Sequence, residues 1–267
     1  MTQPLTHALQ ALVMDSDEPT FAGTDGIFER KFLLPEEAIP HLLRCARQHL
    51  APDKHANSLS GEGYTVNSLY FDDEQLGTYH ALGPEKPPKY RVRRYGDSDT
   101  LFLERKSKPE GKVRKHRTLI PTTELAYLTH EALSTEWEGH WFYHHLHHWR
   151  LRPICFVSYQ RIARVGSIEG QFVRFTLDRE LFCSPAEAVE IPRPLNGKGR
   201  KIDAIIAEVK FEHTLPLPFA KVIMELGLEP VLISKYQKGV ETCGLAPALP
   251  SSYSSFPPQR GQIDVRL

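Results

Sequence analysis

The chain has 267 residues, of which 40% are hydrophobic and 25% are charged, as is ordinary for a soluble globular protein with one substantial core. Its 33 basic residues balance its 33 acidic residues, so net charge gives no general reason to expect affinity for nucleic acid or membranes. The four cysteines are far apart in sequence and form no CxxC pair, which argues against a zinc site or a disulfide framework.

The two ends of the chain differ in composition from its middle. Residues 1–26 are polar with scattered proline and glycine, and they predict a flexible arm without the pattern of a signal peptide. Residues 246–267 are rich in proline and serine and predict a tail. A single folded domain is therefore expected over 27–245. Because no stretch approaches the roughly 20 apolar residues that span a bilayer, we expect a cytoplasmic protein without a membrane segment.

Short strand patterns alternate with a few helices along the folded part. Turn sequences such as GDSD (96–99) and KPEG (108–111) join consecutive strands and so predict antiparallel pairing. The expected fold class is mainly antiparallel β with flanking helices. In chain order we expect a strand at 27–34, a helix at 36–50, a strand at 64–71, a helix at 73–82, strands at 89–95, 100–107 and 112–120, helices at 122–134 and 137–149, strands at 154–165 and 171–178, a loop over 179–200, a strand at 203–211 and a helix at 218–226.

Ionic residues recur at alternate positions in these strands. Residues two apart in a strand share a face, so ERKFLL (29–34) places Glu29 beside Lys31. For any single strand, the simplest interpretation is the solvent face of an antiparallel sheet. The same spacing joins Arg91 with Arg93, Glu104 with Lys106, Lys115 with Arg117, Tyr159 with Arg161, and Glu208 with Lys210.

The recurrence of arginine and lysine in so many strands favours a different arrangement. A sheet of about eight strands usually curls or closes, and if its apolar side faces helices, the ions line its interior. Cations that line such an interior repel one another unless a polyanion supplies negative charge between them. Arginine and lysine suit phosphate oxygens. Carboxylates among them suit Mg²⁺ or Mn²⁺, which prefer oxygen ligands.

A series of motifs carries a family resemblance between about Phe28 and Gly239. In order they are FERKFLL, YTVNSLYFDDEQLGTYH, KYRVRRYG, LFLERKSK followed by VRKHR, SYQRIAR, VRFTLDREL, AEVKFE and SKYQKG. Together they resemble the VTC domain (polyphosphate polymerase type) of the triphosphate tunnel metalloenzyme superfamily, in a bacterial-type stand-alone form. The resemblance implies a closed eight-stranded antiparallel tunnel barrel with a basic interior. The simpler CYTH pattern of the superfamily has ExExK near the start, where this chain has ERK alone.

The resemblance also implies roles for individual residues. Leu232 stands where the family's polymerases commonly carry a lysine, two residues before the serine of SKY, so this chain departs from the pattern at a position that bears on product binding and chain extension. Glu208 would hold the metal ion, and the shared face adds Glu29 and Glu104 as further candidate ligands. The phosphate-binding catalytic cations would be Lys31, Arg91, Arg93, Lys106, Lys115, Arg161 and Arg174, with Tyr159, Ser234 and Lys235 binding substrate beside them.

The activity implied by the resemblance is transfer of the γ-phosphoryl group of ATP to a polyphosphate chain, with Mn²⁺ or Mg²⁺ as cofactor. Two alternatives stay open. The same tunnel could hydrolyse inorganic triphosphate or a nucleoside triphosphate, since only the nucleophile differs. It could also bind polyphosphate without turnover. Nucleic acid is disfavoured as a partner because Tyr90, Tyr95 and Phe102 form no single stacking row with the cations.

Two further features have a structural and a functional interpretation. His140, His144 and His148 have the i, i+4 spacing that can chelate a metal, but a solvated helix surface is the favoured interpretation. Asp72 and Asp73 follow a strand and precede a predicted helix. We expect them to cap that helix rather than to bind metal.

Overall fold

The computed structural model describes residues 27–56, 62–80, 88–107, 114–131, 133–192 and 199–246. The arm predicted over 1–26, the KPEG turn and, apart from Ala246, the predicted tail lie outside the described residues. None of the helices in these ranges has the length and hydrophobicity needed to cross a lipid bilayer.

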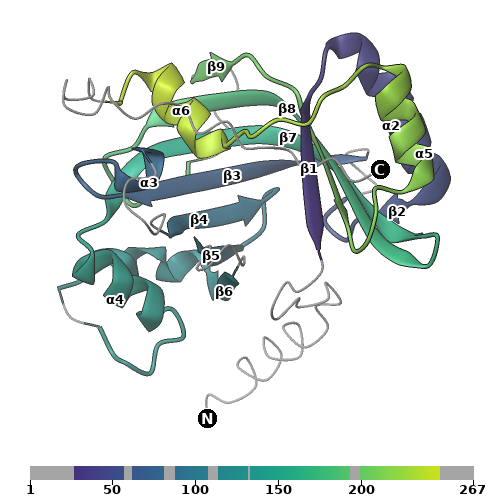
Figure 1. The fold of residues 1–267 in the computed structure, drawn as a ribbon. Helices are drawn as coiled ribbons and strands as arrows, with labels where there is room; N and C mark the ends of the chain where they lie inside the picture. The colour runs from purple at the N-terminus through teal and green to yellow at the C-terminus, as the bar shows by residue number, and fades with distance from the viewer. Residues whose placement is uncertain are drawn as a thin grey trace.

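The described residues form one antiparallel sheet whose main path has the order β1-β10-β8-β7-β3-β4-β5-β6 (Figure 1). This arrangement, with helices packed around it, confirms the predicted fold class. Two short strands extend the sheet, β2 (Ala51–Pro52) beside β7 and β9 (Arg200–Ile202) beside β8. The strands of the main path are β1 (Phe28–Leu33), β3 (Gly63–Asp72), β4 (Lys89–Tyr95), β5 (Thr100–Ser107), β6 (Arg114–Pro121), β7 (Arg152–Ile168), β8 (Gln171–Pro185) and β10 (Ile206–Phe211).

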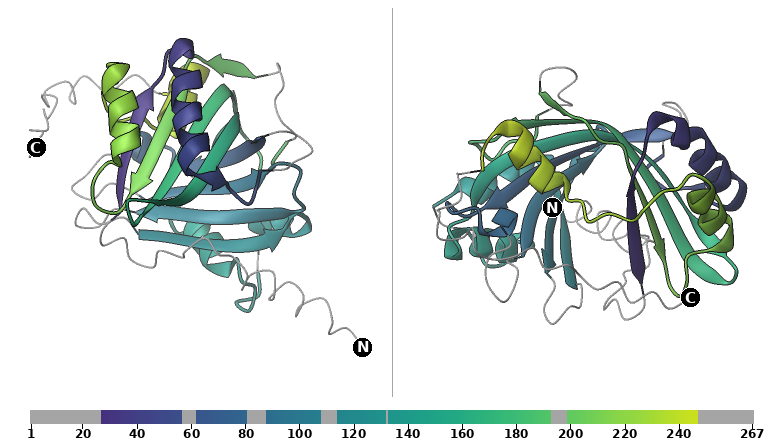
Figure 2. Two further views of the ribbon diagram at one scale, coloured as in Figure 1. Left: turned by 90° about the vertical axis from the view of Figure 1, so that its right-hand side faces the viewer. Right: turned by 45° about the horizontal axis from the view of Figure 1, so that its top comes forward.

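The sheet is strongly curved, so one of its faces is concave (Figure 2). β1 and β6 are the edges of the path, and no backbone pairing joins them within the described ranges. Their sides of the sheet nevertheless interact through charge. Lys115 on β6 and Lys106 on β5 both lie within electrostatic reach of Glu29 on β1 and Lys210 on β10. The curvature therefore brings the two edges toward each other around the concave face.

Helices cover the convex face in two places. Near β8 and β10, an apolar cluster that includes Leu42, Phe175 and Phe219 packs α2 and α5 on the sheet. Near β3, β4 and β5, a second cluster that includes Leu103 and Phe142 packs η3 and α4 on it. The apolar side of the sheet thus faces helices, as the alternation predicts. The helices are η1 (Glu36–Ala38), α2 (Ile39–His49), α3 (Gly77–His80), η3 (Thr122–Thr129), α4 (His140–His148), α5 (Leu217–Glu225) and α6 (Lys235–Cys243).

Two predicted helices differ from the structure. The segment expected to be helical over 122–134 forms the 3₁₀-helix η3, which ends at Thr129 because His130 is extended. The helix expected over 73–82 is reduced to α3 in its described part. Its start confirms the capping prediction: the backbone N–H of Gly77 donates to Asp73, and that of Thr78 donates to Asp72.

The loop predicted over 179–200 is wrong at both ends. β8 continues to Pro185 and β9 begins at Arg200. The register of β7 against β8 shifts between Ser158 and Gln160. This bulge lets β8 keep pairing with β7 although its sequence loses a regular period.

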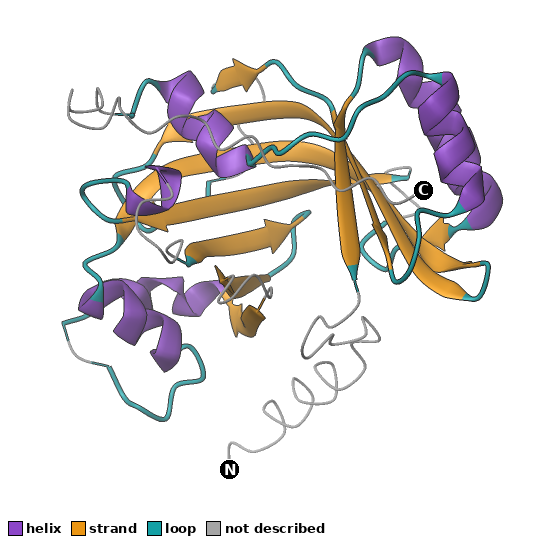
Figure 3. Ribbon diagram, in the orientation of Figure 1, coloured by secondary structure: helices purple, strands orange, loops and turns teal. Residues whose placement is uncertain are grey.

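The helix α6 has no counterpart among the predicted elements. Ser234 caps its start by accepting a hydrogen bond from the backbone of Gln237, and Gly244 ends it in a left-handed conformation. The helix packs on β7 and β8 (Figure 3) through a cluster that includes Tyr159. A Cβ atom on Gly239 would lie 2.7 Å from the Cys155 sulfur, so the glycine permits this close approach.

Candidate functional site

The strand register places the predicted ionic residues on the concave face as one continuous band. Residues directly opposite each other in antiparallel strands share a face, and the band can be followed from β1 to β6 through such pairs. The pairs are Glu29–Lys210, Lys31–Glu208, Lys210–Arg174, Asp178–Arg161, Arg161–Tyr64, Tyr70–Arg91, Ser68–Arg93, Arg91–Glu104, Glu104–Arg117 and Lys106–Lys115. The prediction that these residues lie together is confirmed by the register.

Three arginines of β4 and β6 surround one carboxylate. Arg91 donates from Nε to Glu104, Arg117 donates from Nε to Glu104 Oε1 at 2.8 Å, and Arg93 Nη1 lies 3.8 Å from Oε2. Burial by itself would raise the pKa of Glu104, but the three guanidinium groups outweigh it and hold that pKa well below its usual value. Three cations and one anion leave this cluster with two net positive charges.

A second cluster joins β7, β8 and α6. Arg161 donates to both oxygens of Asp178, at 2.6 and 2.8 Å, and Lys235 Nζ lies 2.7 Å from Asp178 Oδ2. Both cations lie over the ring of Tyr159, at 5.3 and 5.0 Å from its centroid. Two cations and one carboxylate leave one net positive charge.

A third cluster on β1 and β10 is electrically neutral. Lys31 Nζ lies 2.9 Å from Glu29 Oε1, and Lys210 Nζ lies 2.8 Å from Glu208 Oε1. Each lysine also approaches the other carboxylate, at 4.0 and 3.6 Å. Burial opposes ionisation of Glu208, but Lys210, Lys31 and Lys235 hold its pKa well below the usual value. Both carboxylates are therefore ionised at neutral pH.

The carboxylate pair fits the metal that the resemblance implies. Mg²⁺ is usually held by one or two carboxylates together with substrate phosphates and water, rather than by a complete protein cage. Glu29 and Glu208 supply such a pair. The described ranges contain no group of three or more His, Cys, Asp or Glu side chains arranged to hold a metal ion. Glu104 lies apart from this pair, among the arginines.

Two lysines lie opposite each other on β5 and β6. Burial, together with Lys210 and Lys31, lowers the pKa of Lys106 to about 8. The Lys210 ammonium, followed by burial, also lowers the pKa of Lys115. Like charges directly opposite each other destabilise a sheet, so this pair favours a bound anion.

The chain between α5 and α6 crosses the concave side and contacts three strands. Lys31 on β1 donates to the backbone oxygen of Ile233 at 3.4 Å, and Lys89 on β4 donates to Ser234 Oγ at 3.0 Å. Lys235 reaches Asp178 on β8. Within this segment Leu232 is fully exposed to solvent. The segment thus brings Ser234 and Lys235 to the site, as the motif predicts.

Several residues of the site were not among the predicted site residues. Lys89, Arg117 and Lys210 follow the same alternation as their neighbours, and Asp178 lies four residues after Arg174 on the same face. The alternation had already placed Arg117 and Lys210 on the ionic face without a role, and the spacing of Lys89 and Asp178 could have identified those two as well. Asp53, which accepts a hydrogen bond from Arg174 at 2.9 Å, has no such signal because it follows the very short strand β2.

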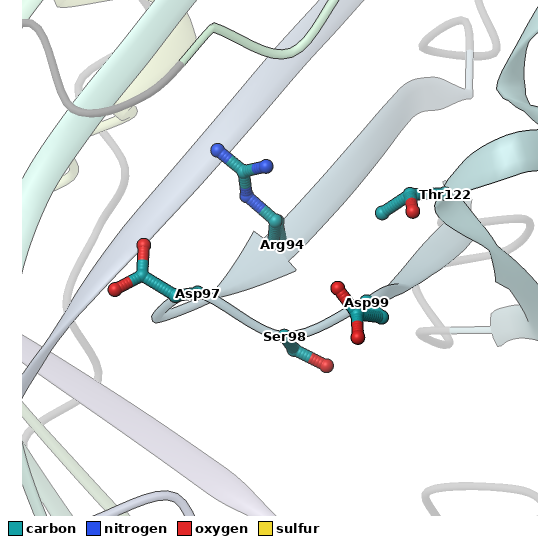
Figure 4. Close-up of a pocket in the computed structure, with 5 residues that line it drawn as sticks. All are labelled: Arg94, Asp97, Ser98, Asp99 and Thr122. Atoms are coloured by element: carbon teal, nitrogen blue, oxygen red, sulfur yellow. The ribbon is translucent and has the colours of Figure 1, made fainter.

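Two other regions lie away from this band. A pocket of about 380 Å³ is lined by Arg94, Asp97, Ser98, Asp99 and Thr122 (Figure 4). Arg94 alternates with Arg93 and so belongs to the opposite face of β4. On α4, the His144 and His148 rings stack with centroids 5.7 Å apart. Neither region includes a residue of the concave band.

Solved structures with similar folds share little sequence with this chain. A candidate adenylate cyclase from Bacillus halodurans has a TM-score of 0.44 at 14% identity and covers 78% of this chain and 95% of its own. HpAC1 of Hippeastrum is a candidate adenylyl cyclase described as having a dominant triphosphatase activity. It has a TM-score of 0.44 at 13% identity, and the match covers 82% of this chain and 96% of HpAC1. PH1819 of Pyrococcus horikoshii OT3 has a TM-score of 0.41 at 15% identity and covers 79% and 96%.

A family model matches most of the length of the chain. No curated protein matches it significantly. The family model described as the VTC domain matches residues 27–243, the same span that contains the concave band. The chain therefore belongs to the VTC domain family, as its motifs predicted.

Proposed function

We propose that the protein is an ATP-dependent polyphosphate polymerase, which transfers the γ-phosphoryl group of ATP to a polyphosphate chain on its concave face. The observation that supports this most is the distribution of charge. Two clusters with net positive charge and a pair of opposed lysines lie beside a neutral cluster that contains two ionised carboxylates. Membership of the VTC domain family supports the same function.

In this proposal the arginines bind the triphosphate. Phosphoryl transfer requires mainly positioning and charge stabilisation, and guanidinium groups can hold phosphate oxygens in a fixed orientation. Arg91 and Arg93 are held by Glu104, and Arg161 by Asp178, so they are oriented before substrate arrives. The terminal phosphate of the acceptor is already an anionic nucleophile, and no general base is required.

Glu208 and Glu29 would hold Mn²⁺ or Mg²⁺. When bound, such an ion neutralises charge that develops on the transferred group and the departing oxygen. Lys31 and Lys210 keep both carboxylates ionised and next to each other. Lys106 and Lys115, opposite each other on the neighbouring side of the face, would attract the polymer.

Incubation of purified protein with ATP and Mn²⁺ tests the proposal directly. We expect a ladder of polyphosphate on a gel. Arg93→Ala and Glu208→Ala should each lower turnover about 100-fold, the size found for loss of one preorganised electrostatic group. Arg47→Ala is the matched control, because Arg47 pairs with Glu62 on the surface.

The product pattern separates the alternatives. Release of phosphate from inorganic triphosphate without polymer would show a hydrolase, a result that Leu232, in place of the usual lysine, makes worth testing. Binding of polyphosphate without turnover would show a binding module. Unchanged turnover in both Arg93→Ala and Glu208→Ala would reject the assignment of the site.

A further inference from the structure

Asp178 is a buried carboxylate that joins two parts of the site. Its side chain is 1% exposed, and its two oxygens contact Arg161 on β7 and Lys235 at the start of α6. We propose that Asp178 is the positioning residue that holds Arg161 and Lys235 together as one phosphate-binding pair and thereby fixes the start of α6 on the concave face. This inference rests on the proposed binding of a phosphate polyanion.

The geometry of the contacts supports positioning. Arg161 and Asp178 are register partners, and two parallel N–H···O bonds fix the plane of the guanidinium group. Lys235 has a long, flexible side chain, and its 2.7 Å contact with Asp178 directs its ammonium group to the same carboxylate. The ring of Tyr159 lies beside both cations. Without Asp178, the buried Arg161 and the partly buried Lys235 would repel each other at this point.

The charge of the cluster is consistent with this role. Asp178 compensates only one of its two partners, so a net positive charge remains available to a phosphate group. Burial opposes its ionisation, yet Arg161 and Lys235 lower the pKa of Asp178, and it stays an anion at neutral pH. An ionised carboxylate repels phosphate. Asp178 therefore acts through its two neighbours and does not itself contact the substrate.

The contact that Asp178 makes with α6 differs in kind from the contacts that other strands make with the segment before this helix. Ile233 and Ser234 are contacted by Lys31 and Lys89, both cations of the concave band. Those two lysines donate to neutral oxygens, whereas Lys235 contacts a charged carboxylate at 2.7 Å. Hydrogen bonds between ionised groups are stronger than those to neutral acceptors, and an ammonium group has three donors. Lys235 can therefore stay paired with Asp178, and hold the start of α6 in place, while it also donates to a phosphate.

Binding of inorganic tripolyphosphate to Asp178→Asn tests the inference, because a purely electrostatic role and a positioning role predict opposite changes in affinity. If Asp178 contributed only negative charge, its removal would tighten binding of a polyanion. If it positions Arg161 and Lys235, binding should weaken by about 10- to 100-fold, the range found when groups that orient a ligand's direct contacts are lost. Isothermal titration calorimetry without metal measures this. Equal or tighter binding would overturn the inference.

Three further comparisons complete the test. Glu62→Gln also removes one negative charge, but from a carboxylate that pairs with Arg47 and Arg164 away from the band, and it should not weaken binding. Asp178→Glu keeps the charge and should restore part of the affinity. In a Lys235→Met background, Asp178→Asn should have a smaller effect than in the wild type, since the two residues act on one contact. Additive effects would contradict a role through Lys235.

The failure of this inference can be distinguished from failure of the proposed function. Wild-type protein that binds tripolyphosphate but forms no polymer would reject the polymerase, while the comparison of variants still decides the role of Asp178. Wild-type protein that does not bind tripolyphosphate would overturn both. If Asp178→Asn does not fold, as judged by circular dichroism, Asp178→Glu decides instead. It should bind more weakly than the wild type, and equal affinity would refute the inference.

Discussion

Glu104 is enclosed by three guanidinium groups, whereas Glu29 and Glu208 share two ammonium groups. The first environment is strongly positive and repels a metal cation, and the second is neutral. We therefore propose that Glu104 orients the arginines and that Glu29 and Glu208 bind the metal. Carboxylates on the same face of one sheet thus have different environments, which are set by the cations opposite them.

Replacement of Glu104 by glutamine should destabilise the protein. The three arginines would lose their carboxylate, and breaking a buried ion pair in this way costs about 3–5 kcal/mol. Urea unfolding measures the change. Added tripolyphosphate should recover part of the loss, because it supplies anionic oxygens to the same guanidinium groups. Glu62→Gln, on the surface, should cost about 1 kcal/mol or less, and an equal loss in both variants would contradict this account.

Lys106 should make anion binding depend on pH. Its pKa is lowered to about 8, so its ammonium group is present at neutral pH and is lost as pH rises through about 8. Tripolyphosphate affinity should therefore fall between neutral and alkaline pH. The stability of the unliganded protein should change in the opposite direction. Because the folded-state pKa of Lys106 is below its unfolded value, loss of this proton above about pH 8 favours the folded state. Calorimetric titrations over pH with Lys106→Met as control measure the first effect. If tripolyphosphate affinity in Lys106→Met falls with pH as it does in the wild type, the pH dependence belongs to another group.

At the scale of single elements, α6 depends on one close contact with the sheet. Gly239 faces β7, where an added Cβ atom would lie 2.7 Å from the Cys155 sulfur and 3.0 Å from Val157 Cγ2. The same helix begins with Lys235, whose ammonium group reaches Asp178. Packing in the middle of α6 and ionic contacts at its start therefore belong to one element, and a change in the first should affect the second.

Gly239→Ala should displace α6. We expect a loss of stability of about 1–3 kcal/mol, typical of overpacking, together with weaker tripolyphosphate binding as Ser234 and Lys235 move. Thermal unfolding and calorimetry measure the two effects. The double variant Gly239→Ala with Cys155→Ala removes the contacting sulfur and should recover both. Wild-type affinity in Gly239→Ala alone would show that the site does not depend on the seating of α6.

For the molecule as a whole, a net charge of zero conceals a strongly uneven distribution. Basic residues gather on the concave face, with carboxylates compensating only part of their charge. The curvature of the sheet holds these groups close together. A folded protein without a bound anion therefore contains unrelieved repulsion, and a polyanion that binds only the folded state should stabilise it.

Tripolyphosphate should raise the melting temperature of the protein. At 100 times the dissociation constant, a ligand of the folded state adds about 2.7 kcal/mol of stability. The shift should shrink at high salt because screening weakens the attraction of exposed charges. Differential scanning fluorimetry over a series of ligand and salt concentrations measures both effects. A shift that salt leaves unchanged would argue against ionic binding on the concave face.

The alternation of charged and apolar residues was sufficient to predict most strands, the shared face and the cations on it. This signal is local: side chains alternate between faces every residue, whatever the rest of the chain does. The capping by Asp72 and Asp73 was predictable for the same reason. By contrast, η3 over Thr122–Thr129 has helix-like composition but a different hydrogen-bonding pattern, and composition does not distinguish the two.

The sequence by itself determined the family, the fold class and the identity of the ionic face. Only the tertiary structure decided which charges meet. Asp53 contacts Arg174, and Asp178 contacts Lys235, across 121 and 57 positions of the chain. Cys183 on β8 and Cys243 in the last turn of α6, although distant in sequence, are free thiols whose sulfurs lie 3.3 Å apart. Such contacts depend on the register and curvature of the whole sheet, and no local period in the sequence encodes them.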